Sequence, residues 1–281
     1  MDNGLAHELS VREIQLVSLE ILKRIDAICK EQGLTYYLTY GTLIGAIRHN
    51  GFIPWDDDVD IAMPRKDYDA LQCYFESHGA ELQPLIALHN TKSRKLPFLI
   101  TRITDTRYKQ IGECSEDVPE MGAFVDVYPL DGLGSTEEEA IAEKKRCHSL
   151  SVAYLRSCNF SCHNKGNGLF KRIAKTARAA LMRSPEYYEN QLLLSCSNDI
   201  YESSSYIACK VWTVSRLSSV INPSCEFASV EYVPFEDMLA PVPAGFDSLL
   251  RRIYGDYMQL PPENERVGHH GYSIVKRGES D

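Results

Sequence analysis

The run Asp56–Asp60 places four carboxylates within five residues and leads directly into the apolar segment Ile61–Met63. If this segment enters a β-strand, Asp58 and Asp60 share one face while Val59 is buried on the other. Two carboxylates so close repel each other and raise each other's pKa, unless a cation keeps both ionised. Mg²⁺ suits such hard oxygen ligands. The alternative interpretation is a solvated surface turn, where runs of Asp are common.

The bulk composition favours a packed cytoplasmic protein. A chain of 281 residues with 44% hydrophobic content can form one large domain or two small ones. No stretch approaches the roughly 18 apolar residues of a membrane span, and the first residues lack the order of a signal peptide. The nine cysteines are scattered, as expected of reduced thiols. Zinc binding by Cys158, Cys162 and His163 is disfavoured because their spacing is not that of a standard finger.

Charge is distributed unevenly along the chain. The net charge is −9, but residues 144–183 contain ten Lys or Arg and no Asp or Glu, which leaves 20 basic against 39 acidic residues, or −19, elsewhere. Apolar residues at helical spacing over 169–181 predict a basic helix, whose charged face holds Lys171, Arg172, Lys175 and Arg178. Such a face is either ordinary solvated surface or a dock for an anionic acceptor or the membrane surface. A nucleic-acid partner is not expected.

Local patterns predict alternating helices and strands. A helix over 11–32 begins at a capping box formed by Ser10 and Glu13 and ends at Gly33. The alternation predicts one α/β domain over residues 1–281, with a helical insertion at about 135–200. The other expected elements are strands near 35–40, 58–63, 98–104, 123–129, 206–212 and 228–235, and helices near 43–47, 66–75 and 246–254.

Gly41 and Thr42 stand between an expected strand and an expected helix. Glycine lets a phosphate approach the backbone, and a helix beginning near Thr42 offers free N–H groups and a positive dipole end. Asp126 lies on a strand of buried residues, where a carboxylate is costly without a cation or donor beside it. Together, Asp58, Asp60 and Asp126 would hold one or two Mg²⁺ (or Mn²⁺) ions that bridge a pyrophosphate.

Three segments resemble the motifs of the LicD family, which includes bacterial phosphorylcholine transferases and the related fukutin-type ribitol-phosphate transferases. They are residues 40–63, residues 122–132, and residues 254–258 with Pro261, Pro262, His269 and His270. The resemblance implies a nucleotidyltransferase-like mixed sheet flanked by helices. It also implies a metal-dependent transfer of a phospho-alcohol from a CDP-activated donor to a hydroxyl of a cell-surface glycan precursor, with release of CMP.

The resemblance also implies roles for individual residues. Asp58 and Asp60 match the metal-binding pair, and Asp126 matches the third carboxylate. Asp126 or Asp131 is the candidate proton acceptor. Asp56 and Asp57 are assigned either to support of the metal ligands or to strand entry. The candidate substrate-binding residues are Gly41 and Thr42 on the phosphate side, the basic residues Arg48, Lys95 and Arg102, and His269 and His270 of the closing motif.

Phosphocholine is the first expected cargo. Its quaternary ammonium needs aromatic faces, for which Trp55 and Tyr128 are the candidates, with Tyr36 and Tyr40 behind them. Three alternatives stay open: transfer of ribitol or glycerol phosphate, transfer of NMP from an NTP with release of pyrophosphate, and a catalytically silent nucleotide- or glycan-binding module. The acidic triad argues against the silent module, because buried carboxylates are costly without a metal. The acceptor is expected to be anionic or lipid-linked and to be met at the inner face of the membrane.

Overall fold

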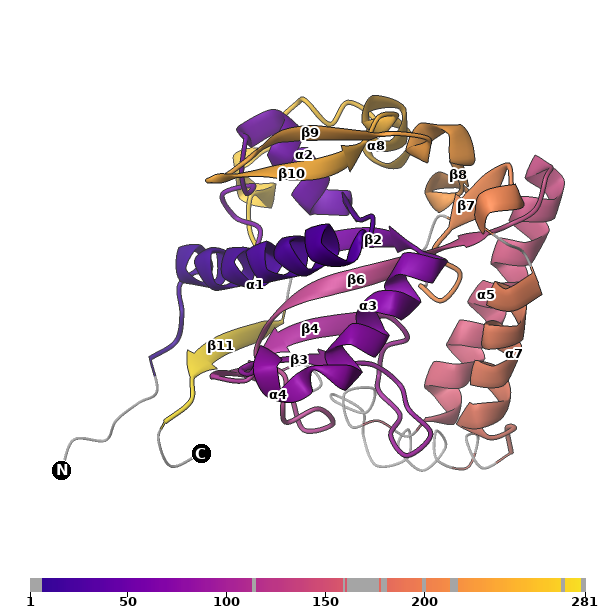
Figure 1. The fold of residues 1–281 in the computed structure, drawn as a ribbon, viewed down its shortest axis with the longest axis horizontal. Coiled ribbons are helices and arrows are strands. Elements are labelled where there is room, and N and C mark those ends of the chain that lie inside the picture. Colours follow the sequence, from indigo (N-terminus) through magenta and orange to yellow (C-terminus); the bar gives the residue numbers. More distant parts are fainter. Residues whose placement is uncertain are drawn as a thin grey trace.

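The protein is a mixed α/β structure, described here from a computed structural model (Figure 1). The structure describes residues 7–112, 115–158, 160, 177, 181–198, 201–212, 217–268 and 271–278. Its central sheet has the strand order β1–β2–β6–β4–β3, and β7 and β8 extend it beyond the end of β6. Strands β2 and β6 are parallel, and the other neighbours are antiparallel. The predicted mixed sheet flanked by helices is therefore confirmed.

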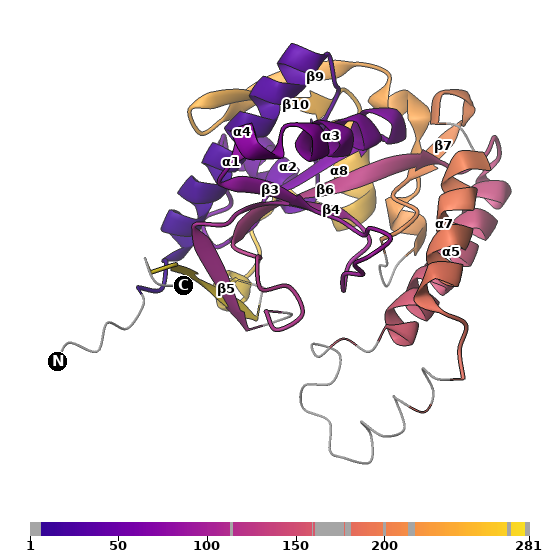
Figure 2. The ribbon, with the colours of Figure 1, turned by 60° about the horizontal axis from the view of Figure 1, so that its bottom comes forward.

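The bounds of the sheet strands follow the chain. They are β1 Tyr37–Leu38, β2 Asp60–Pro64, β3 Leu85–Leu88, β4 Thr101–Asp105, β6 Ala123–Gly132, β7 Tyr206–Ala208 and β8 Asn222–Pro223. Two ribbons lie outside this sheet: β9 Val230–Phe235 with β10 Met238–Pro243, and β5 Tyr108–Gly112 with β11 Tyr272–Lys276 (Figure 2). The second ribbon joins the middle of the chain to its last described strand.

The helices surround the sheet. They are α1 Val11–Gln32, α2 Tyr40–His49, α3 Arg65–Ser77, α4 Gly79–Leu82, α5 Glu137–Ser157, α7 Pro185–Asn198 and α8 Phe246–Tyr254. Short 3₁₀ turns are η2 Tyr201–Ser203, η3 Leu217–Val220, η4 Ser224–Phe227 and η5 Glu263–Glu265. Helices α2 and α8 lie together with the β9–β10 ribbon at the side of the sheet formed by β1 and β2, while α5 and α7 lie side by side at one end of the molecule (Figures 1 and 2).

Helix α1 shows how local signals set element bounds. The Ser10 side chain accepts from the Glu13 backbone N–H, the Glu13 carboxylate accepts from Ser10, and Gly33 closes the helix with φ of 66°. Leu22 and Ile25 of its apolar stripe are fully buried. Both the capping box and the C-terminal glycine were predicted, and the observed bounds agree with them.

Other bounds differ from the prediction. Only Tyr37 and Leu38 of the expected 35–40 strand pair with β2, because Tyr40 takes a left-handed φ of 47° and begins α2. The acidic strand begins at Asp60, so Asp56–Val59 forms the loop before it. Strands β3, β5, β10 and β11 lie outside every expected strand.

The insertion near 135–200 contains two long helices in its described part, α5 and α7. Helix α5 begins at a second capping box, in which Thr136 and Glu139 bond reciprocally. The predicted basic face, Lys171, Arg172, Lys175 and Arg178, lies outside the described residues, as do Cys162 and His163. Within the described part of the chain, no helix combines the length and apolar character needed to cross a bilayer.

Candidate active site

Two parallel strands bring separate acidic segments together. Asp60 opens β2 and is the direct neighbour of Asp126 in β6, and the Asp126 backbone N–H donates to the Val59 carbonyl at 2.8 Å. Neighbouring strands lie about 4.8 Å apart, so the two carboxylates come from adjacent backbone positions. All ten residues of β6 are buried. The structure thus brings Asp60 and Asp126 together at the N-terminal end of β2, and the charge of Asp58 also acts on Asp60.

The loop before β2 adds carboxylates to this cluster. Asp56, Asp57 and Asp58 each offer an oxygen, and these oxygens all lie within 4.8 Å of one another. Asp57 is 9% exposed, and Asp56 and Asp58 are partly buried. The sequence assigned Asp56 and Asp57 to strand entry or to support of the metal ligands, and the structure places both within reach of a cation that Asp58 could hold. We call Asp56, Asp57, Asp58, Asp60 and Asp126 the acidic cluster.

The side chain of Asp60 carries the clearest sign of a cation site. Its Oδ1 atom is buried and has no hydrogen-bond partner among the described residues. Burial raises the pKa of Asp60 well above its usual range, and the charges of Asp58, Asp126 and Asp56 raise it further, while a hydrogen bond from Tyr128 opposes the rise. A divalent cation would supply the missing partner and offset the repulsion. The donor set, carboxylate oxygens alone, fits Mg²⁺ or Mn²⁺.

The first turn of α2 packs against the acidic cluster. The Thr42 hydroxyl accepts from the Asp60 backbone N–H at 2.8 Å and is only 2% exposed, so Thr42 positions β2 from inside the fold. A Cβ atom on Gly41 would lie 2.5 Å from Asp56 Oδ2. Glycine is therefore needed here for close approach, but the group approaching it in this structure is a carboxylate of the protein itself.

Arg102 is the predicted basic residue that the structure does bring to the cluster. It is the antiparallel neighbour of Asp126 and donates to both of its carboxylate oxygens, at 2.7 and 3.1 Å. Its guanidinium lies 4.6 Å from the Phe98 ring centroid and 4.4 Å from that of Phe124. The pair is desolvated and bidentate, so Asp126 is held in one orientation.

Tyrosines from four segments surround the acids. Burial and the nearby carboxylates raise the pKa of Tyr128 and Tyr272 far above the usual phenol range. Tyr40 packs edge-on against Tyr128, with ring centroids 5.0 Å apart. Tyr254 keeps 44% of its surface exposed, yet burial of its remainder and the charges of Asp60, Asp56 and Asp58 also raise its pKa. These phenols stay protonated, so they can donate hydrogen bonds into the site.

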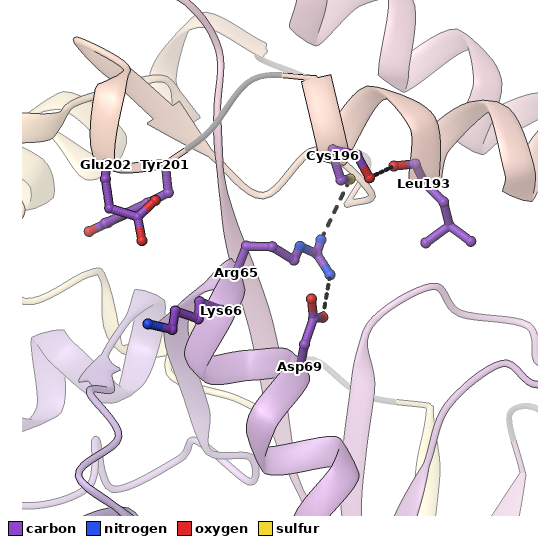
Figure 3. A pocket seen from close by; sticks show the side chains of 8 residues that line it. Arg65, Lys66, Asp69, Leu193, Cys196, Tyr201 and Glu202 are labelled. Carbon is purple, nitrogen blue, oxygen red and sulfur yellow. Dashed lines mark hydrogen bonds and ion pairs between the residues drawn. The ribbon is translucent and has the colours of Figure 1, made fainter.

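Asp131 is not part of the acidic cluster. It lies five residues beyond Asp126 on β6, about 16 Å along the strand and on the opposite face. Both of its oxygens accept from Arg65, at 2.7 and 3.0 Å, and it is 1% exposed. Arg65 also contacts Asp69 and Cys196 at the wall of a cavity of about 440 Å³ between α3 and α7 (Figure 3). The suggested role of Asp131 as proton acceptor does not fit this placement.

Two predicted phosphate contacts bind other parts of the protein. Lys95 pairs with Glu189 of α7, and Arg48 donates to the Tyr257 carbonyl at 2.6 Å. Both side chains therefore already contact other parts of the fold, and no described contact joins either of them to the acidic cluster. Lys95 thus forms an ion pair within the fold.

The structure separates the two predicted aromatic residues. Trp55 packs at the edge of the core, and the Arg266 guanidinium lies 5.8 Å from its ring centroid. Tyr128 instead contacts Tyr40 and Trp212. Tyr36 is 3% exposed and bonds to Asp26 of α1. His269 and His270 lie outside the described residues.

Comparison with known proteins identifies the family. Residues 33–131 match the family model described as "LicD/FKTN/FKRP, nucleotidyltransferase domain". The lipopolysaccharide cholinephosphotransferase LicD of Haemophilus influenzae is 28% identical over 269 residues, which cover 94% of this chain and 97% of that protein. Residues 33–131 are thus identified as a LicD-family domain, and the chain is similar to a LicD protein over most of its length.

Two shorter matches involve proteins of unassigned function. An uncharacterized protein of Rickettsia prowazekii is 38% identical over 53 residues, or 19% of this chain and 20% of that protein. One from Rickettsia typhi is 36% identical over 58 residues, or 20% and 19% of the two chains. The LicD match over 33–131 begins at the end of α1 and includes every residue of the acidic cluster.

Several residues that complete the site lie beyond the LicD-matched segment. Tyr254 belongs to a motif that the sequence singled out, whereas Tyr272 and Trp212 carried no comparable signal. Gly268, four residues before Tyr272, lies close to the acidic loop, because a Cβ atom on it would be 3.9 Å from Asp57 Oδ2. The C-terminal part of the chain is thereby brought to the acidic loop by tertiary packing, which no local pattern predicts.

Proposed function

We propose that this LicD-family protein is a phosphotransferase that moves phosphocholine from CDP-choline to a hydroxyl of a cell-surface glycan precursor and releases CMP, with Mg²⁺ or Mn²⁺ as cofactor. The observation that carries the proposal is the acidic cluster, in which Asp60 has a buried oxygen without a partner beside Asp58 and Asp126. Phosphoryl transfer needs such a cation site, because the reacting phosphate and the leaving nucleotide are both anionic. The full-length similarity to a lipopolysaccharide cholinephosphotransferase supports the choline cargo.

The roles of the residues follow from their positions. Asp58, Asp60 and Asp126 would hold the cation, with Asp56 or Asp57 able to complete its coordination. When bound, the cation neutralises charge on the donor's phosphates. Thr42 fixes the start of β2 through the Asp60 backbone, and Arg102 orients the Asp126 carboxylate.

Asp126 remains as the proton acceptor for the attacking hydroxyl. Of the two acids that the sequence suggested for this role, only Asp126 lies in the acidic cluster. The buried phenol of Tyr272 adds a donor that stays protonated at neutral pH, whereas that of Tyr128 donates to Asp60. Tyr272 can stabilise negative charge on the transferring group without competing for the proton.

A donor panel tests the proposal directly. The protein is incubated with Mg²⁺ and, separately, CDP-choline, CDP-ribitol, CDP-glycerol and NTPs, and the release of CMP and pyrophosphate is measured. Metal-dependent CMP release, fastest with CDP-choline, is expected. Asp58→Asn and Asp60→Asn, made singly, should each reduce it by at least about a hundredfold. Pyrophosphate release from an NTP would instead indicate nucleotidyl transfer, and unchanged turnover in both variants would refute the assignment of the site.

A further inference from the structure

The second tryptophan of the chain lies against the site. Trp212 is far from the acidic loop in sequence, yet its ring centroid lies 5.3 Å from that of Tyr128 at an interplanar angle of 87°. Tyr128 in turn meets Tyr40 at 5.0 Å and 73°. The three rings therefore form a continuous aromatic wall, contributed by α2, β6 and the segment after β7.

This wall stands beside the acidic cluster. Tyr128 follows Asp126 by two residues on β6, so its side chain is on the same face and about 7 Å further along the strand. In phosphocholine, four bonds separate phosphorus from nitrogen. A phosphate held at the acidic cluster would thus place its quaternary ammonium at about the distance of this wall.

The surfaces of the three rings differ in accessibility. Tyr128 is only 4% exposed and backs the wall, whereas Tyr40 and Trp212 are partly exposed. Tyr40 is held with φ of 47°, a conformation that is rare and strained for an aromatic residue. Strain of this kind persists only where surrounding structure enforces it, and it concentrates at functional sites.

A buried lysine fixes the position of Trp212. Lys144 of α5 is 1% exposed, and its ammonium donates to the backbone carbonyls of Cys209 and Trp212, the latter at 2.8 Å. The turn that carries Trp212 is therefore tied to the helical insertion. Trp55, the other tryptophan, already has the Arg266 guanidinium near its ring and is a poor candidate for a second cation.

We infer that Trp212, with Tyr40 and Tyr128 behind it, recognises the quaternary ammonium of the donor and makes this enzyme selective for choline. The inference rests on the proposed function, because it assigns the specificity of the same reaction. Cation–π attraction is strongest on the indole face and acts only on a cationic cargo. Lys144 is a positioning residue that acts through Trp212.

The chain contains two tryptophans, which permits a direct binding test. In Trp55→Phe protein, Trp212 is the sole tryptophan, so its fluorescence can be followed while CDP-choline or CDP-glycerol is added in Mg²⁺-containing buffer. CDP-choline should change the intensity saturably and more strongly than CDP-glycerol, whose cargo is neutral. Equal responses to the two donors, or no response to CDP-choline while CMP is being released from it, would overturn the inference.

Kinetics of the substituted wall provide an independent test. Trp212→Leu should raise KM for CDP-choline about tenfold and leave KM for CDP-glycerol nearly unchanged, whereas Trp212→Phe should retain most of the affinity. Tyr232→Leu is a matched control, because Tyr232 is an aromatic residue that is 58% exposed on β9. Equal losses for both donors would overturn the inference and leave phosphotransfer intact. Absence of CMP release from every donor would instead refute the proposed function. Should Trp212→Leu not fold, the fluorescence experiment on Trp55→Phe still decides.

Discussion

The Asp60→Asn substitution distinguishes the effect of the acidic cluster on the stability of the metal-free protein from its effect on activity. In metal-free protein, Asp60 is 7% exposed, one of its oxygens lacks a partner among the described residues, and Asp58 and Asp126 repel it. Asparagine removes the charge and adds two N–H groups that can donate hydrogen bonds to the neighbouring carboxylates. We therefore expect Asp60→Asn to stabilise the metal-free protein while it abolishes activity.

The expected gain is about 2 kcal/mol, because leaving a buried polar or charged group unsatisfied costs about 1–3 kcal/mol or more. For a domain of this size, each kcal/mol shifts Tm by roughly 2–4 °C, so Tm in EDTA should rise by about 4–8 °C. In Mg²⁺, wild-type protein should instead have the higher Tm. Mg²⁺ at a hundred times its Kd stabilises wild-type protein by about 2.7 kcal/mol, whereas Asp60→Asn has lost a metal ligand and should be stabilised only weakly.

The assay is thermal unfolding at pH 7 in EDTA and in excess Mg²⁺, beside CMP release from CDP-choline. Asp131→Asn is the matched control, since Asp131 is also a buried aspartate of the central sheet but accepts two hydrogen bonds from Arg65. The substitution removes the buried partner charge of the Arg65 guanidinium, whose other carboxylate contact is the longer one with Asp69, and should destabilise the protein by about 3–5 kcal/mol with or without Mg²⁺. If Asp60→Asn is destabilised in EDTA as Asp131→Asn is, Asp60 is a structural acid and the metal-site argument fails.

Three further predictions concern the surroundings of the site. Gly41→Ala, whose Cβ would displace the Asp56 carboxylate, should raise the Mg²⁺ concentration for half-maximal CMP release several-fold, whereas Gly45→Ala, which meets the Gly51 carbonyl oxygen, should mainly lower Tm. Lys144→Met should raise KM for CDP-choline about three- to tenfold but not KM for CDP-glycerol; equal effects on both would contradict positioning through Trp212. Burial alone would raise the pKa of Glu143, but hydrogen bonds from Arg146 and Ser195 and the charge of Lys210 lower it to about 2. Its stabilisation is thus present above pH 4.5 and lost as pH falls toward 2, so Glu143→Gln should cost about 1–2 kcal/mol in urea unfolding at pH 7 and almost nothing near pH 2.

Local sequence signals predicted the elements whose ends are chemically marked. Helix α1 follows from a capping box and a terminal glycine, and α8 agrees with the expected 246–254 helix. Strand β6 was expected from its β-branched and aromatic residues, although it continues three residues beyond 129. The missed strands β5 and β11 pair with each other across more than 150 residues of sequence, so their stability comes from tertiary pairing and not from local propensity.

The acidic cluster was predictable because four of its members lie within the five residues 56–60, and the fifth, Asp126, lies on the neighbouring strand β6. The aromatic wall was predictable only in part. Tyr128 and Tyr40 were named as candidates, and Trp55 was named because it adjoins the acids along the chain, whereas Trp212 was not considered. Proximity in sequence does not determine where the side chain of a loop residue points. Trp212 is held beside Tyr128 because Lys144 of α5 donates a hydrogen bond to its backbone carbonyl.

Asp131 could have been separated from Asp126 by the sequence itself. Side chains alternate along a strand, so residues at an odd spacing, as 126 and 131 are, face opposite sides of the sheet. Only one of them can then point toward Asp60, and the parallel register of β2 with β6 makes that residue Asp126. The other face carries α3, whose first residue, Arg65, directly follows β2 and neutralises Asp131. Both acids of this strand are paired by an arginine of the fold, Asp126 by Arg102 and Asp131 by Arg65, but only Asp126 lies beside the carboxylates of the acidic cluster.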